Sequence, residues 1–306
     1  MLNKLIVSNF YHFKDPYTLN LKGKKRVLLV GPKGSGKTSL GFALSNPFFY
    51  FSFREGKKET PQYIKVPNAF DAARFLFQFS TPSGEITYRY SIDEDGGICS
   101  EQIGVGKQTV LYRNMFRRHR VYLKRSFARL NTDFLIAVCY FSTALYVILR
   151  YSGLFDFETV TDIYVFFFGI CYLNPLSAKD DRLIERRLSR SKESFNAFFE
   201  VLRHNGYPYD SFTLGKSKIF LHDPEKGDIR FFKQAPEDVI RLLRLFFALY
   251  GRRYDPSLLF VDDFDLAFDG RAKESALSLL LEAPTKQVII ASKKNIEAKG
   301  FATMKL

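Results

Sequence analysis

Cysteine is scarce in this chain of 306 residues, with only three thiols, at Cys99, Cys139 and Cys171. Three widely spaced cysteines match neither a disulfide framework nor a CxxC metal site. Scarce cysteine therefore favours a reducing compartment, and we expect a cytoplasmic protein. His12, His204 and His222 likewise lie near no cysteine or second histidine at ligand spacing, so the sequence predicts no transition-metal site.

Long apolar runs are also lacking. The longest uncharged run, Phe134 to Leu149, is shorter than the ~18 residues that mark a membrane span, and it contains polar residues. It predicts a buried helix. The N-terminal residues MLNKLIVSNFYHF hold no continuous apolar stretch of the kind a signal peptide needs. We therefore expect neither secretion nor a membrane partner.

The composition is that of a globular chain with excess positive charge. Hydrophobic residues make up 46%, enough to bury one large core or two modest ones. The net charge of +14 favours a polyanionic partner, with nucleic acid ahead of acidic protein. The densest basic segment, residues 113–129, interleaves arginines with aromatic residues and is a candidate nucleic-acid contact. The same segment also fits a solvated helix face.

Residues 1–112 form the first part of the chain and are mainly strand-like. The runs Leu5–Val7 and Tyr17–Leu21 flank a turn and predict a β-hairpin. Arg26–Val30 is a short apolar run bounded by glycines, typical of a buried parallel strand. After a helix from about Thr38 to Leu44, the stretch Phe48–Tyr112 alternates aromatic and polar residues, which predicts an antiparallel β layer.

The rest of the chain divides at about residue 215. Residues 113–215 carry apolar clusters at helical spacing and predict an inserted, mostly helical lobe. Residues 216–306 return to β character. They predict a hairpin, a helix that starts at Pro236, and a closing βαβ unit. The expected elements are Lys218–Leu221, Ile229–Phe232, Leu258–Val261, a helix near Lys273–Leu281, and Gln287–Ala291.

A glycine-rich loop follows the strand at Arg26–Val30 and precedes the predicted helix. It matches GxxxxGK[ST] in full, the Walker A pattern that binds ATP phosphates. Glycines let backbone amides turn toward phosphate oxygens, and the helix adds its positive N-terminus. Lys37 is expected to contact the β and γ phosphates and Thr38 to ligate Mg²⁺. The expected phosphate-binding residues are Gly31, Pro32, Lys33, Gly34, Ser35, Gly36, Lys37, Thr38 and Ser39.

A second metal anchor is expected at the end of an apolar strand, and Leu258–Val261 is followed by Asp262 and Asp263. Asp262 is expected to hold Mg²⁺. Asp263 is a candidate catalytic residue, together with Lys37, because its carboxylate could orient or deprotonate the attacking water. Asp263 also fits an exposed turn starter.

The segments SNFYHFKDPYTLNL, RVLLVGPKGSGKTSL, LLFVDDFD and QVIIAS resemble bacterial AAA/ABC-type ATPases related to RecF, SMC and OLD-like ATPases. The resemblance covers both ends of the chain well and the middle only by architecture. It implies an α/β fold of the P-loop NTPase, ABC-ATPase type: a mixed sheet, an antiparallel β layer and an inserted helical lobe. Residues 1–112 and 216–306 are then two parts of one ATPase head. The family also implies a dimer that sandwiches ATP.

Asp265 matches an aspartate of the dimer-facing loop in that family. Two other positions and one segment depart from the family pattern. Asp263 stands where a catalytic glutamate is usual and has one methylene less, so hydrolysis is expected to be slow. Lys293 is the nearest match to the switch histidine and cannot accept the same hydrogen bonds. The signature segment is Lys233–Glu237, whose proline removes an amide donor and whose glutamate adds negative charge.

The resemblance implies an ATPase or ATP-driven assembly switch, forming a homo-oligomer or a complex with an effector protein. By analogy, small heads of this family point to phage defence or another genome-conflict system. Two other functions stay open: a nucleotide-dependent scaffold that does not hydrolyse ATP, and a RecF-like repair ATPase that binds DNA.

Overall fold

The computed structural model describes residues 1–51, 71–114, 120–123, 143, 157–251 and 255–306. The chain forms two compact units, each built from two separate stretches of sequence. Unit 1 holds Met1–Lys25 and Gly34–Tyr172, and unit 2 holds Arg26–Lys33 and Leu173–Leu306. Neither unit is therefore a contiguous segment of the chain.

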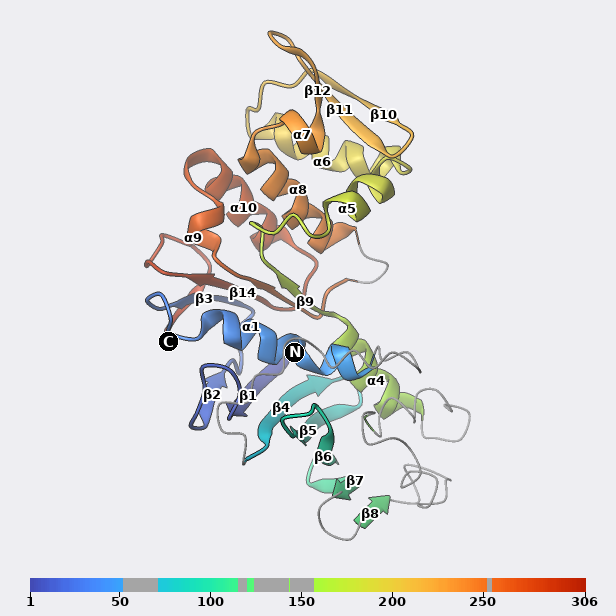
Figure 1. The fold of residues 1–306 in the computed structure, drawn as a ribbon, viewed down its shortest axis with the longest axis vertical. Helices are drawn as coiled ribbons and strands as arrows, with labels where there is room; N and C mark the ends of the chain where they lie inside the picture. The colour runs from blue at the N-terminus through green and yellow to red at the C-terminus, as the bar shows by residue number, and fades with distance from the viewer. Residues whose placement is uncertain (52–70, 115–119, 124–142, 144–156, 252–254) are drawn as a thin grey trace. The chain divides into compact units, whose positions relative to one another are not determined.

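An antiparallel sheet forms most of unit 1, with the strand order β2-β1-β4-β5-β6-β7-β8 (Figure 1). Buried and exposed side chains alternate along its strands, as the aromatic and polar pattern of this stretch predicts. The predicted hairpin and antiparallel layer are therefore confirmed. The strands are β1 (Leu2–Ser8), β2 (Tyr17–Asn20), β4 (Ala73–Thr81), β5 (Gly84–Ile92), β6 (Ile98–Val105), β7 (Gln108–Asn114) and β8 (Arg120–Leu123).

Aromatic side chains pack a helix onto one face of this sheet. Phe79 of β4 stacks on Phe166 with ring centroids 4.1 Å apart, and Tyr88 of β5 meets Phe167 edge-on at 5.4 Å. Both partners belong to α4. The described helices of unit 1 are α1 (Lys37–Phe51) and α4 (Phe157–Phe168).

The first helix is longer than the sequence indicates. The sequence predicts an end near Leu44 and strand from Phe48, but α1 continues to Phe51 with Pro47 inside it. A short apolar run with no clear period does not separate helix from strand, which accounts for the difference.

A buried ion pair lies within the sheet of unit 1. Arg113 of β7 and Glu101 of β6 are opposite each other in the register, with Nη2 3.0 Å from Oε2 and both side chains at most 1% exposed. Tyr88 donates its hydroxyl to Oε1 of Glu101 at 2.9 Å. Burial first, and then the Glu101 carboxylate, raise the pKa of Tyr88 well above its usual value, so the hydroxyl keeps its proton.

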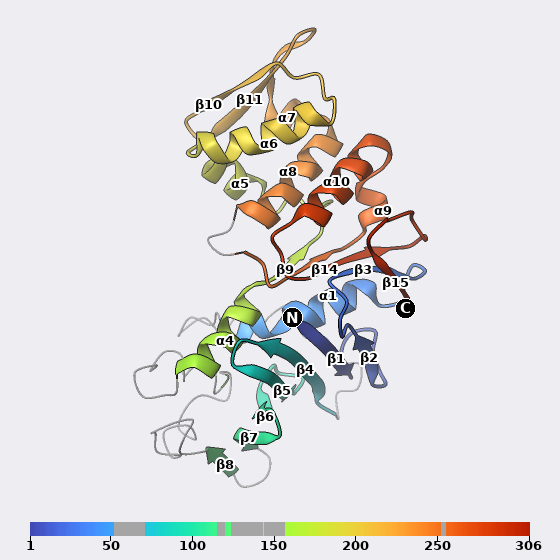
Figure 2. The same ribbon diagram turned by 180° about the vertical axis from the view of Figure 1, so that it is seen from behind.

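A second sheet has five strands in the order β15-β3-β14-β13-β9, and all of them except β9 lie wholly in unit 2. Figure 2 labels all of these strands except β13. The β13–β14, β14–β3 and β15–β3 pairs are parallel. The residues of β13 and β14 are all buried, as their unbroken apolar sequences predict. The strands are β3 (Arg26–Val30), β9 (Ile170–Leu173), β13 (Leu258–Val261), β14 (Val288–Ser292) and β15 (Ala302–Lys305).

Helices and a small antiparallel sheet complete unit 2. The predicted closing βαβ unit is confirmed as β13, α10 and β14, and α8 starts directly after Pro236. The predicted hairpin is present as β11 and β12, but Phe231 and Phe232 begin α7 rather than extend a strand. These elements are α5 (Asp181–Leu188), α6 (Lys192–His204), β10 (Ser211–Gly215), β11 (Lys218–Asp223), β12 (Gly227–Arg230), α7 (Phe231–Gln234), α8 (Glu237–Tyr250), α9 (Phe264–Ala267) and α10 (Gly270–Glu282).

The lobe predicted at residues 113–215 is described only in part, and its boundaries stay a prediction. Its described portion contains the helices α4, α5 and α6, and also the strands β8, β9 and β10. The apolar run Phe134–Leu149 lies outside the described residues except for the buried Thr143. Within the described ranges, no helix has the length and apolar character needed to cross a membrane.

The buried ion pair provides a test of the packing of unit 1. We expect Arg113→Met to lower the free energy of unfolding by about 3–5 kcal/mol, because it leaves the Glu101 carboxylate buried without its counter-charge. Adding Glu101→Gln should recover part of this loss. Urea-induced unfolding measures both effects.

Arg74→Met is the matched control, because Arg74 pairs with Asp71 at the surface with side chains 60% and 41% exposed. Its loss should stay below about 1 kcal/mol. Equal losses for the two arginine variants would contradict a special role of burial.

Candidate nucleotide-binding site

The glycine-rich loop begins at the end of a buried parallel strand. Gly31 directly follows β3, and its backbone amide donates to the carbonyl of Ser292 at 3.1 Å, so the start of the loop is held against β14. Pro32 and Lys33 come next and are exposed. These three predicted phosphate-binding residues belong to unit 2.

The second half of the loop, Gly34–Ser39, belongs to unit 1 and leads into α1. Gly36 has φ +97°, a conformation that glycine adopts without strain. A Cβ atom there would lie 2.8 Å from Cδ2 of His12 and 3.1 Å from Cζ of Phe13. The N-terminal hairpin loop therefore packs directly against the glycine and leaves no room for a side chain.

The start of α1 combines a buried lysine with accessible backbone. Lys37 is only 6% exposed, and its Nζ donates to the Ser35 hydroxyl at 3.4 Å. Thr38 is exposed and Ser39 half-exposed. The first turn of α1 holds no acidic residue, so the positive end of the helix keeps its affinity for an anion.

The predicted metal anchor lies at the end of β13. Asp262 is fully buried, its amide donates to the carbonyl of Leu173 at 2.8 Å, and its Oδ1 accepts the amide of Asp263 at 3.0 Å. Asp263 has φ +49°, which is strained for a residue other than glycine. Such strain persists where the surrounding structure fixes it, as at functional sites.

Four neighbouring strands of the five-stranded sheet present polar or loop residues at one edge. Gly31 follows β3, Lys293 follows β14, and Asp262 follows β13. Asn174 follows β9 and lies level with Asp262, because the preceding carbonyl of Leu173 accepts the Asp262 amide. Oδ1 of Asn174 also accepts the backbone amide two residues on, at 3.0 Å. Sequence reasoning missed Asn174, although a short apolar run ending in Asn-Pro was a usable signal.

Asp265 joins two of the loops at this edge. Its Oδ1 accepts the backbone amide of Lys293 at 3.0 Å, which links the loop after β13 to the loop after β14. The Ser292 hydroxyl donates to the carbonyl of Lys294 at 2.6 Å and closes the turn that holds Lys293. The described contact at the predicted switch position is thus made by the backbone, a group that any residue type supplies.

The predicted signature segment leads into the N-terminus of α8. Glu237 and Asp238 lie in the first turn of this helix and bring negative charge to its positive end. Tyr207 donates to Oδ2 of Asp238 at 3.2 Å. Burial, and then the Asp238 carboxylate, raise the pKa of Tyr207 and keep its hydroxyl a donor. This charge makes the end of α8 unfavourable for an anion.

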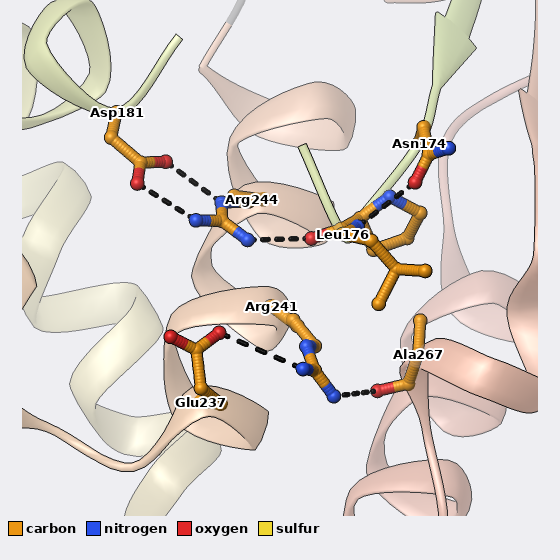
Figure 3. Close-up of polar contacts among 8 residues, drawn as sticks. Asn174, Leu176, Asp181, Glu237, Arg241, Arg244 and Ala267 are labelled. Carbon is orange, nitrogen blue, oxygen red and sulfur yellow. Dashed lines mark hydrogen bonds and ion pairs between the residues drawn. The ribbon is translucent and has the colours of Figure 1, made fainter. Parts of the chain in front are cut away.

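Two arginines tie α8 to the loops at the sheet edge (Figure 3). Arg244 contacts both oxygens of Asp181 at 2.7 Å and donates to the carbonyl of Pro175 at 2.6 Å. Arg241 donates to the carbonyl of Ala267 at 3.2 Å and lies 3.7 Å from Glu237. The segment after β9 and the short helix α9 after β13 are therefore both fixed to α8.

The basic segment 113–129 is corrected at its first residue. Arg113 is buried in its ion pair with Glu101 and cannot contact a phosphate backbone. Residues 120–123 form β8, and the remainder, from residue 115 on, lies outside the described residues. The charge of a segment does not reveal its burial, which explains this error.

Comparison with known proteins identifies the fold. No family model matches the sequence. No curated protein matches it. A structure of the SmcHead bound to the C-winged helix domain of ScpA matches with 14% identity, a TM-score of 0.52, and coverage of 99% of this chain and 94% of that one. An SMC head domain from Thermotoga maritima has 17% identity, 95% and 89% coverage and a TM-score of 0.46. An Smc head domain with an extended coiled coil, bound to the C-terminal domain of ScpA and derived from Pyrococcus furiosus, has 12% identity and a TM-score of 0.47. The match covers 96% of this chain and 89% of that one. The chain thus has the ABC-type ATPase fold of SMC heads.

The packing around Gly36 predicts how the loop responds to a side chain. We expect Gly36→Ala to weaken ATP binding at least tenfold, about 1.4 kcal/mol, because the new Cβ meets His12 and Phe13 at a strained φ. Calorimetric titration with ATP and Mg²⁺ measures the loss.

Gly34→Ala is the matched control, because Gly34 has φ +84° but no heavy atom lies within 4 Å of the position that a Cβ would take. It should lose less affinity, and His12→Ala added to Gly36→Ala should recover part of the loss. Equal losses at both glycines would contradict the contact with His12.

Proposed function

We propose that this chain binds ATP with Mg²⁺ through Gly31–Ser39 and Asp262, and that the nucleotide drives association with a second copy or an effector protein. One observation carries the proposal. The strands β3 and β13 both pair in parallel with β14, so the start of the glycine loop and the buried Asp262 lie at the same edge of one sheet. This is the edge at which open α/β sheets bind their ligands.

The residue types fit the phosphates and the metal. The loop amides and the ammonium of Lys37 supply positive charge, and Gly36 has φ +97°, a backbone conformation that glycine adopts without strain. The hydroxyl of Thr38 and the carboxylate of Asp262 are hard oxygen ligands of the kind Mg²⁺ prefers. Ser39 adds a further amide in the first turn of α1. Bound Mg²⁺ would neutralise charge on the phosphates.

Two exposed leucines favour association at this edge. Leu266 is 48% exposed in α9, just after β13, and Leu176 is 40% exposed just after β9. Apolar residues beside a charged site are typical of a surface that another protein covers. One similar structure is an SMC head bound to a domain of ScpA, which supports a protein partner here as well.

Hydrolysis is proposed to be slow. Asp263 would orient the attacking water, but its carboxylate is one methylene shorter than that of a glutamate, and its backbone is fixed in the left-handed region. The charged end of α8, with Glu237 and Asp238, also makes activation of a partner's nucleotide unfavourable. If no turnover occurs at all, the protein is a nucleotide-dependent scaffold.

Lys37→Ala tests the proposed function. We expect it to abolish the heat of ATP–Mg²⁺ binding and the ATP-dependent increase in mass, because the phosphates lose their buried counter-charge. Calorimetry and light scattering measure the two effects. Lys22→Ala, which removes an exposed lysine, is the control.

Leu266→Ser separates binding from association: it should bind ATP normally and fail to gain mass. Binding by Lys37→Ala at the wild-type level would refute the proposal.

A role in phage defence, proposed from the sequence resemblance alone, requires this site, so Lys37→Ala should also restore phage plating on cells that express the protein.

Asp263 is tested by the rate of phosphate release at saturating ATP. We expect Asp263→Asn to lower turnover at least tenfold and Asp263→Glu to retain or raise it, because the longer side chain reaches the water more easily. Both variants should bind ATP like the wild type. Unaltered turnover in Asp263→Asn would remove the residue from the reaction.

A further inference from the structure

A polar track crosses the antiparallel sheet of unit 1 on the face opposite the aromatic core. Its residues are directly opposite one another in the strand register and therefore share one face. None of them is acidic. From β2 to β7 they are Asn20, Lys4, Gln78, Thr87, Gly104 and Thr109. With strands about 4.8 Å apart, the track is about 24 Å long, which exceeds a small ligand and suits a polymer.

A cavity lies at the β5–β6–β7 end of this track. It has a volume of about 190 Å³, and Gly104 lies in its floor, between Thr87 and Thr109. The register of β6 and β7 shifts at Gly104, and a bulge at a glycine inside a strand often marks a place where a ligand approaches the backbone. The volume is below the roughly 300 Å³ of a small-molecule site, so it suits one group of a larger molecule.

The charge around the cavity favours an anion. Arg89 and Lys107 line it and are both exposed, and none of its lining residues is acidic. Gln102 and Gln108 also line the cavity, and Nε2 of Gln102 donates to the Thr109 hydroxyl at 3.0 Å. Glu85 precedes Thr87 by two residues on β5, and its Oε1 accepts the side-chain amide of Asn3 at 3.4 Å.

An aromatic ring stands beside these groups. Tyr112 is opposite Gln102 in the register of β6 and β7, and its hydroxyl accepts the amide of Asn114 at 3.1 Å, which fixes the ring. Cations, amides and a fixed half-exposed tyrosine on one open face match the requirements of single-stranded nucleic acid, in which phosphates meet cations and bases stack on rings. An acidic peptide would use the cations but not the tyrosine.

We infer that the outer face of β5, β6 and β7 binds single-stranded nucleic acid, with a phosphate between Arg89 and Lys107 and a base on Tyr112. The strand runs along the polar track toward Lys4. This site does not depend on the proposed ATP site. Among the residues that the structure describes, it takes the place of the buried Arg113 as the candidate for a nucleic-acid contact.

The test is fluorescence anisotropy of a labelled oligo(dT) strand titrated with the full chain at several salt concentrations. Wild-type protein should bind, and Arg89→Ala/Lys107→Ala should weaken binding at least tenfold and reduce the slope of log K against log salt by about 1.4. Gly104→Val should weaken binding with the slope unchanged, because its side chain fills the cavity floor near Thr87.

Arg190→Ala/Lys192→Ala is the control, since it removes the same two charges from exposed positions in unit 2. It should bind like the wild type. The inference is overturned if wild-type protein does not bind oligo(dT) at low salt, or if both double variants lose affinity equally. Tighter binding of duplex DNA, or equal competition by polyglutamate, would also overturn it. ATP binding by Arg89→Ala/Lys107→Ala should be normal, which separates this site from the nucleotide site.

Discussion

The parallel pairing of β3, β14 and β13 is the constraint on which the candidate nucleotide site depends. In parallel strands all carboxyl ends meet at one sheet edge, so segments more than 200 residues apart in the sequence deliver their loops to the same place. The backbone amide of Gly31 donates to the carbonyl of Ser292, and that of Asp262 donates to the carbonyl of Leu173. These two bonds continue the hydrogen bonding between the strands into the loops. The position of Asp262 is therefore set by the sheet rather than by a flexible connection.

The loops at this edge are connected to one another and to α8. Asp265 holds the amide of Lys293, Arg241 holds the carbonyl of Ala267, and Arg244 holds the carbonyl of Pro175. A displacement of one loop would strain these bonds, since each arginine or carboxylate contacts a backbone atom of a different segment. The edge of the sheet and α8 thus have the contacts needed to move as one body.

Local patterns were enough to predict the parts of the fold with strong sequence signals. The buried strands Arg26–Val30 and Leu258–Val261 were found to the residue, because unbroken apolar runs beside glycine or aspartate are distinctive. β9 was missed because its four apolar residues lie among helical patterns, and β15 because three of its four residues are exposed and it has no apolar run. The bond between Asp265 and Lys293, 28 residues apart, requires the fold itself. The burial of Arg113 also followed from strand pairing rather than from its basic neighbours.

The separation of β3 from its partners along the chain has a consequence for biosynthesis. β3 leaves the ribosome early, but it pairs with two strands that are synthesised late. These are β14, which begins at Val288, and β15, which begins at Ala302. At 5–20 residues per second, its apolar residues wait about 10 to 50 s for these partners. In the antiparallel sheet of unit 1, β1 and β2 precede β3 and the strands β4 to β8 follow it, so these strands meet their partners much sooner. A nascent chain of this protein therefore carries a folded first half with an unpaired apolar strand, the kind of intermediate that chaperones bind.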